Sequence, residues 1–215
     1  NVVYKNEKIL IGKYIFKFND IIQEAYLNRI SLSSNGFYST PKINFNKEKF
    51  YGRPFLYFCY GASVSEVTID TLTGENIVDR VDILHDAGKP INPALEIGQI
   101  EGGFIQGQGW LTIEEVKWKA NGQITTFSPS TYKIPAVSDM PKKFNVEIYK
   151  DGKNKEKVVN KAKTTGEPPL MLAMSVFYAI KDAIASVKNY KKIPSINAPA
   201  TPEKILMSIK NLTKN

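Results

Sequence analysis

The sequence is poor in cysteine and histidine, the side chains that bind soft metal ions. Its 215 residues include one cysteine, Cys59, and one histidine, His85. A single thiol excludes an intramolecular disulfide, and one Cys with one His excludes a zinc or iron–sulfur site built from these side chains. A catalytic Cys59–His85 pair stays open, because residues distant in sequence can meet in a fold. The surroundings favour structural roles for both: Cys59 lies in an aromatic run, and His85 follows a predicted strand.

Arginine is also scarce, although the chain is basic. The formal net charge is +8, yet only three of the 29 basic residues are arginine: Arg29, Arg53 and Arg80. Arginine is the preferred side chain for bidentate contacts with phosphates and base edges. The scattered lysines therefore indicate a solvated surface, and a basic nucleic-acid-binding module is the less favoured alternative.

No uninterrupted apolar run reaches the roughly 18 residues that a membrane-spanning helix needs. The longest candidate, residues 168–187, contains Lys181 and Asp182 and is typical of a buried helix. The N-terminus has neither an initiator methionine nor a signal-peptide pattern. We therefore expect a reduced, cytoplasmic protein without a membrane partner, and a chain that is a fragment of a longer one.

The residues that are present suit a packed core. Hydrophobic residues make up 42% of the sequence, and apolar alternation predicts strands at 62–70, 77–84 and 144–149. The other predicted elements are extended segments in 1–18, a helix over 20–29 capped by Asn19 or Asp20, a buried strand at 55–60, a helix from Asn92-Pro93, a hairpin over 110–127, and a buried helix from Pro168 to about Val187. Mixed, largely antiparallel strands with inserted helices predict an α+β fold, with no internal domain boundary in 1–215.

The helix predicted after Asn92 is rich in glycine. Gly98 and Gly102 are four residues apart, as are Gly103 and Gly107, so each pair shares a helical face. Each glycine destabilises a helix interior by about 0.5–1 kcal/mol relative to alanine. Such faces allow close approach of another backbone or of a flat ligand.

Glutamines accompany these glycines. Gln99, Gln106 and Gln108 each carry an amide that both donates and accepts hydrogen bonds. Amides of this kind suit the edge of a heterocycle. Tight helix packing with surface glutamines is the alternative interpretation.

A second candidate site surrounds Glu167. Pro168 disfavours helical geometry at Glu167, and Pro169 suits the first turn of the following helix. Burial would favour the neutral carboxyl group, whereas the helix N-terminus would favour the carboxylate, a balance typical of general bases. A glutamate that only caps the helix or compensates its dipole is the alternative.

Three motifs occur in order along the chain. They are Gly-Gln-Ile-Glu-Gly-Gly-Phe-Ile-Gln-Gly at 98–107, Pro-Ser-Thr-Tyr-Lys-Ile-Pro-Ala at 129–136 and Gly-Glu-Pro-Pro-Leu at 166–170. Together they resemble the C-terminal, molybdenum-cofactor-binding part of the xanthine dehydrogenase family, and the resemblance extends over about residues 20–208. The related aldehyde oxidases usually have Gly-Glu-Ser in the third motif, so this sequence resembles the xanthine branch more closely.

The resemblance implies an oxidoreductase that hydroxylates purines, hypoxanthine and xanthine, to urate. By this resemblance Glu167 is the general base, Gln99 hydrogen-bonds to the molybdopterin, and Gly102 gives the cofactor room. In the family the cofactor's own dithiolene sulfurs hold the molybdenum, so no side chain of this sequence is expected to ligate metal. Further 2Fe-2S clusters and FAD are expected elsewhere in the assembly.

The resemblance covers only the last part of a molybdenum subunit. The family's upstream cofactor loops and substrate-gripping residues do not occur in this sequence. We therefore expect 1–215 to be the C-terminal portion of a molybdenum-cofactor-binding domain, inactive alone. Its expected partners are the rest of that subunit, iron–sulfur and FAD domains or subunits, and a purine, in an oligomeric assembly without nucleic acid. An aldehyde or other N-heterocycle hydroxylase of the same superfamily is the alternative.

Overall fold

The computed structural model describes residues 1–214 and divides into two compact units, Asn1–Pro54 and the chain from Phe55 onward. Each unit has its own sheets. The assignment of all 215 residues to the C-terminal portion of one cofactor-binding domain stays a prediction.

The first unit begins with a three-stranded antiparallel sheet. Its elements are β1 (Val2–Lys5), β2 (Lys8–Ile11), β3 (Tyr14–Lys17), α1 (Phe18–Leu27), β4 (Asn44–Asn46) and β5 (Tyr51–Arg53). The strands β1, β2 and β3 are neighbours in chain order, and β4 pairs with β5 as a separate hairpin. The extended N-terminal segments and the helix are confirmed. The predicted cap is wrong, because α1 starts earlier, with Lys17 as N-cap and no side-chain cap bond.

The first unit has no core of its own. None of residues 1–54 is buried, and apolar side chains such as Phe37, which is 94% exposed, face outward. Exposed apolar surface of this extent is typical of a segment that packs against another protein surface.

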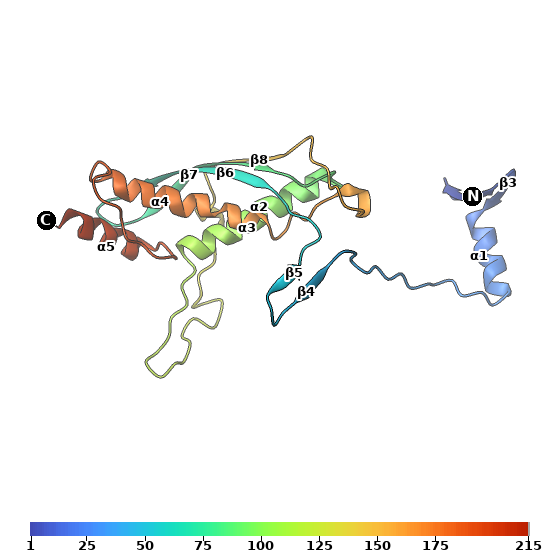
Figure 1. The fold of residues 1–215 in the computed structure, drawn as a ribbon, viewed down its shortest axis with the longest axis horizontal. Helices are drawn as coiled ribbons and strands as arrows, with labels where there is room; N and C mark the ends of the chain where they lie inside the picture. Colours follow the sequence, from blue (N-terminus) through green and yellow to red (C-terminus); the bar gives the residue numbers. More distant parts are fainter. Residues whose placement is uncertain (215) are drawn as a thin grey trace. The chain divides into compact units, whose positions relative to one another are not determined.

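The second unit is a mixed three-stranded sheet with helices against one face (Figure 1). Its elements are β6 (Gly61–Ile69), β7 (Asn76–His85), α2 (Pro93–Thr112), β8 (Lys143–Ile148), α3 (Pro169–Leu172), α4 (Met174–Ser186) and α5 (Pro202–Thr213), with short 3-10 turns at Val137–Asp139 and Val159–Lys161. The sheet order is β6-β7-β8; β6 and β7 are antiparallel, and β7 and β8 are parallel. The three predicted strands and the α+β fold are confirmed.

The core lies between this sheet and its helices. Val81 and Ile83 point inward from β7 and pack with Ile100 of α2 and Ile180 of α4. The alternation of buried and exposed residues along β7 produces this inward face. The sheet therefore fixes the position of α2, the glycine-rich helix, beneath it.

The parallel pairing of β7 with β8 requires a crossover, which α2 and the long loop after it provide (Figure 1). The hairpin predicted over 110–127 is confirmed only in its central part, residues 117–125. Its first residues, Trp110 to Thr112, are the last turn of α2. Around the turn, Lys119 N donates to the carbonyl oxygen of Gln123 and Thr125 N to that of Lys117, both at 2.9 Å, on either side of an isolated bridge between Trp118 and Ile124. The turn at Gly122 is retained, with φ of 82°.

Two other predictions are corrected. Residues 55–60 form no strand, and Phe55 and Phe58 are exposed, although Leu56 is buried. The helix from Pro168 is broken at Ala173 into α3 and α4 and buries one side only, since Met171 and Tyr178 are exposed. The apolar stretch Pro169–Ser186 is long enough to cross a membrane by length and composition, a criterion that core helices of soluble proteins also meet.

Candidate active site

The start of α2 is fixed by side chains on both sides of its first turn. The side-chain oxygen of Asn92 accepts a hydrogen bond from Leu95 N at 3.4 Å. Glu96 reaches back, and its Oε1 accepts from Ile91 N at 2.7 Å. The predicted start of this helix is confirmed, with Pro93 in its first turn.

The glycines of α2 form two different faces. A β-carbon at Gly103 would lie 2.6 Å from the carbonyl oxygen of Gly166, and one at Gly107 would collide with the carbonyl oxygen of Leu170. A β-carbon at Gly98 or Gly102 would have nothing within 4 Å. Gly103 and Gly107 thus allow close packing of another backbone, whereas Gly98 and Gly102 leave an open helical surface.

The segment that carries Glu167 lies against this helix. A β-carbon at Gly166 would come 3.3 Å from Gln99 Oε1, and Gly103 faces the Gly166 carbonyl. The fold therefore brings the first and third sequence motifs together, although Gln99 and Glu167 are 68 positions apart in the chain.

Glu167 itself is exposed and is separated from the start of α3 by Pro168. Its carbonyl oxygen accepts a hydrogen bond from Leu170 N at 3.1 Å. Among residues 1–214, neither the Glu167 carboxylate nor the Gln99 amide has a side-chain hydrogen-bond partner. Both groups are available to a ligand.

These residues fit a flat heterocyclic cofactor. The surface at Gly98 and Gly102 has room that larger side chains would fill, and the adjacent Gln99 offers both a donor and an acceptor. Among residues 1–214 no cluster of three or more His, Cys, Asp or Glu side chains is placed to hold a metal ion. Any metal at this surface would need ligands from another source, such as the cofactor.

Cys59 and His85 do not form a reactive pair. The Cys59 thiol donates to the carbonyl oxygen of Thr164 at 3.2 Å. Burial raises the pKa of this thiol despite the nearby Lys163, which disfavours the reactive thiolate. His85 is 1% exposed, and burial lowers its pKa. The surroundings of both residues therefore favour a structural role over a catalytic one.

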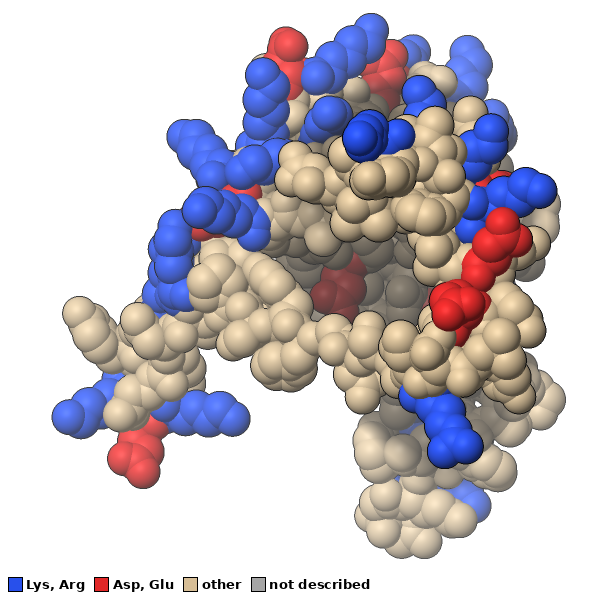
Figure 2. Space-filling view, turned by 90° about the vertical axis from the view of Figure 1, so that its right-hand side faces the viewer, with Lys and Arg blue, Asp and Glu red and all other residues tan. Residues whose placement is uncertain are grey.

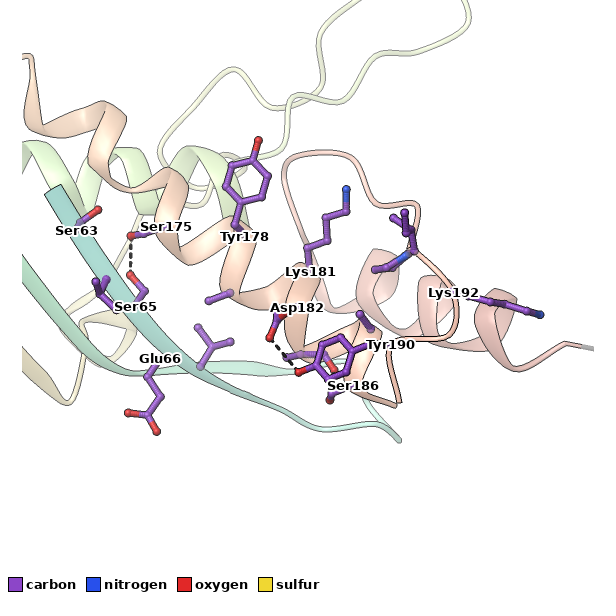
Figure 3. Close-up of a pocket in the computed structure, with 17 residues that line it drawn as sticks. Ser63, Ser65, Glu66, Ser175, Tyr178, Lys181, Asp182, Ser186, Tyr190 and Lys192 are labelled. Carbon is purple, nitrogen blue, oxygen red and sulfur yellow. Dashed lines mark hydrogen bonds between the residues drawn. The ribbon is translucent and has the colours of Figure 1, made fainter. Parts of the chain in front are cut away.

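A groove of about 950 Å³ lies elsewhere, between the edge strand β6 and helix α4 (Figure 3). Ser65 and Ser175 share a hydrogen bond of 2.7 Å at its base, and Tyr190 donates to Asp182 near its other end. None of the three predicted site residues lines this groove.

Lysine and arginine side chains lie on the surface drawn in Figure 2. A groove-like concentration of positive charge is the usual electrostatic footprint of nucleic-acid binding. With only three arginines among 29 basic residues, the composition fits the solvated-surface interpretation better.

The sequence model of a family described as "Molybdopterin cofactor-binding domain" matches residues 1–141, including the open glycine surface of α2. The chain belongs to this family. The resemblance of the first two motifs to a molybdenum-cofactor-binding region is thereby confirmed, as is the expectation of a molybdopterin cofactor; the third motif, at 166–170, lies outside the matched residues.

Relatives with similar sequences are xanthine dehydrogenases. The chain is 47% identical over 194 residues to "Xanthine dehydrogenase/oxidase" of Felis catus, a match that covers 87% of this chain and 14% of that protein. It is 45% identical over 209 residues to "Xanthine dehydrogenase" of Oryza sativa subsp. japonica, a match that covers 92% of this chain and 15% of that protein. The chain thus spans about one seventh of the length of these relatives.

A solved structure with the same fold is quinoline 2-oxidoreductase from Pseudomonas putida 86. The match has a TM-score of 0.69 and 25% sequence identity, and it covers 97% of this chain and 26% of that one. It extends the similarity beyond residue 141 to nearly the whole described chain.

One feature of the site was not predicted from the sequence. Lys163, four residues before Glu167, forms an ion pair with Asp86 at 2.5 Å, and both side chains are largely buried. The two residues are 77 positions apart. The sequence holds no spacing that pairs them, because only the fold brings the end of β7 to this segment.

Proposed function

We propose that this chain forms one wall of the active site of a molybdenum hydroxylase that oxidises hypoxanthine and xanthine. The observation that carries the proposal is the placement of Gly166, next to Glu167, against Gln99 and Gly103 of α2. The segment that carries Glu167 thereby lies against the Gln99 amide, on the same helix as the open surface at Gly98 and Gly102. The 45–47% identity to xanthine dehydrogenases favours purines as substrates.

Each residue has a distinct role in this proposal. The open surface at Gly102 seats the pterin, and the Gln99 amide hydrogen-bonds to its edge. When bound, the molybdenum cofactor supplies the electron-accepting centre. The Glu167 carboxylate takes the proton from the oxygen nucleophile that adds to the purine carbon, as a general base. Its lack of another partner in residues 1–214 leaves its oxygens available for that proton.

The proposal includes a larger assembly. The remainder of the molybdenum-binding subunit would cover the apolar side chains that residues 1–54 expose. Iron–sulfur clusters and FAD, held by other domains or subunits, would carry electrons away from the site. The assembly is proposed to be oligomeric and cytoplasmic, and residues 1–215 alone are expected to show no xanthine oxidation.

The test is Glu167→Gln in the full-length enzyme that contains this chain. Turnover of xanthine should fall about 10²–10⁴-fold, because a positioned general base contributes that much. Bound molybdenum should remain at the wild-type level. Glu147→Gln, at an exposed residue of β8, is the matched control. Near-normal turnover of Glu167→Gln would refute the role of this residue.

A second candidate has its own support. The structural match to quinoline 2-oxidoreductase covers 97% of the chain, so oxidation of another N-heterocycle, or of an aldehyde, uses the same framework. Turnover of purines, quinolines and aldehydes by the full-length enzyme distinguishes the candidates. A higher kcat/KM for quinoline or an aldehyde than for xanthine would favour the second.

A further inference from the structure

We propose that Asp86 and Lys163 are positioning residues that hold Glu167 in place through the backbone of residues 163–167. The inference rests on the proposed function of Glu167 as general base. It assigns to a buried ion pair an effect on the chemical step.

The ion pair is shielded from solvent. Lys163 Nζ lies 2.5 Å from Asp86 Oδ2, and the two side chains are 7% and 15% exposed. The same ammonium group lies 5.0 Å from the centre of the Tyr60 ring. Opposite charges that are shielded from water attract each other strongly. The Lys163 ammonium group is therefore held in one well-defined position.

Asp86 is in turn attached to the sheet. It follows directly after β7, and its backbone N donates to the carbonyl oxygen of Tyr60 at 2.8 Å. Its other side-chain oxygen, Oδ1, accepts from Gly88 N at 2.9 Å. The ion pair therefore connects the Glu167 segment to the end of β7, whose inward side chains are part of the core.

Backbone bonds support the same connection. Lys163 N donates to the carbonyl oxygen of Ala87 at 2.8 Å, and Lys89 N donates to the carbonyl oxygen of Lys161 at 3.1 Å. Gly88 and Ala162 form a β-bridge between these two bonds. Residues 161–163 therefore run alongside residues 87–89 and pair with them.

The last residues before Glu167 are also held. The Thr164 carbonyl accepts from the Cys59 thiol at 3.2 Å, and Thr165 is buried. Gly166 packs against Gly103, and Pro168 follows Glu167 with its φ fixed by its ring. Residues 163–167 therefore form one ordered, tightly packed segment, and we infer that a rearrangement of this segment at Lys163 shifts Glu167.

Catalysis is sensitive to displacements of this size. A shift of about 1 Å in a reacting group can lower the rate about 100-fold. Removal of the Lys163 charge leaves Asp86 buried without its partner, which favours rearrangement of this pair and of the backbone attached to it.

The experiment compares Lys163→Met with Lys163→Arg in the full-length enzyme. For Lys163→Met we expect kcat for xanthine to fall about 10- to 100-fold, with KM and bound molybdenum unchanged. Lys163→Arg keeps the charge and should retain more of the activity. Amide hydrogen exchange at residues 164–167 should be faster in Lys163→Met. Lys142→Met, which breaks the exposed pair with Asp79, is the control and should behave as wild type.

A double-variant cycle separates positioning from general stability. If Lys163 acts through Glu167, Lys163→Met should lower kcat in the wild-type background and cause no further loss in Glu167→Gln. Asp86→Asn serves as the second variant if Lys163→Met does not assemble. A kcat within twofold of wild type, or an equal loss in both backgrounds, would overturn the inference. A Glu167→Gln enzyme whose kcat for xanthine equals that of the wild type would instead overturn the proposed function.

Discussion

Gly103 of α2 lies directly against the carbonyl oxygen of Gly166, so closely that a β-carbon at residue 103 would come within 2.6 Å of that oxygen. This contact joins the glycine-rich helix to the segment that precedes Glu167. The closely packed glycines, Gly103 and Gly107, bring the two segments together, while Gly98 and Gly102 leave an adjacent surface open. One helix thus has a packing face and an open face, and substitutions on the two faces should have different effects.

Alanine at the packing face should destabilise the protein, whereas alanine at the open face should not. Gly103→Ala forces a methyl group against the Gly166 carbonyl and should lower the free energy of unfolding by about 1–3 kcal/mol. Gly98→Ala, with nothing within 4 Å, should raise it by about 0.5–1 kcal/mol through helix propensity. Urea denaturation of the two variants measures both values. Equal effects of the two substitutions would contradict the division into faces.

Gly102→Ala should separate folding from cofactor binding. The added methyl group meets no protein atom within 4 Å, so stability should increase by about 0.5–1 kcal/mol. The same methyl group occupies the surface proposed for the pterin. Molybdenum per molecule of full-length enzyme should therefore fall below the wild-type value. A normal molybdenum content would place the cofactor elsewhere.

The Asp86–Lys163 pair should show the asymmetry of buried ion pairs. Lys163→Met or Asp86→Asn alone should lower the free energy of unfolding by about 3–5 kcal/mol, because one charge loses its partner. The double variant should be more stable than either single variant. The exposed pair between Arg80 and Asp82 should contribute little, as surface pairs do. Denaturant titrations of all variants provide the comparison.

His85 should make the protein less stable in mild acid. Burial lowers its pKa from 6.5, opposed by Asp86 and assisted by Lys163. The unfolded chain then binds more protons than the folded chain below about pH 6.5, so stability present above that pH is lost as the pH falls. The change is at most about 1.4 kcal/mol per pH unit for one group.

The comparison for this effect is His85→Met, an apolar residue that adapts to buried space. Unfolding measured between pH 7 and pH 5 should show a steeper loss of stability in the wild type than in His85→Met. Parallel pH profiles of the two proteins would show that another group is responsible.

Much of the second unit was predictable from local patterns. Alternating side chains predicted β6, β7 and β8, because half-buried strands require this period. Asn92 and Pro93 predicted the start of α2 through capping geometry. The site residues were suggested by motifs, and their roles at Gln99, Gly102 and Glu167 remain predictions.

Other features depended on neighbours that a local pattern does not contain. The aromatic run at 55–60 has strand-like composition but pairs with no strand. The helix after Pro168 breaks at Ala173, where the Leu172 carbonyl accepts hydrogen bonds from Ser63 of β6 and from Ser175. The first residues of the hairpin predicted over 110–127 are helical instead, because α2 continues as far as Thr112, which is buried.

The sequence by itself determined the chemistry available to this protein: a glycine-rich helix, an amide and a proline-fixed carboxylate, with one cysteine and one histidine. These properties follow from residue types and short spacings. Only the tertiary structure decided which glycines pack and which stay open, and that Asp86 meets Lys163. Such relationships arise where segments distant in the chain share one core, since the close packing of that core selects one arrangement.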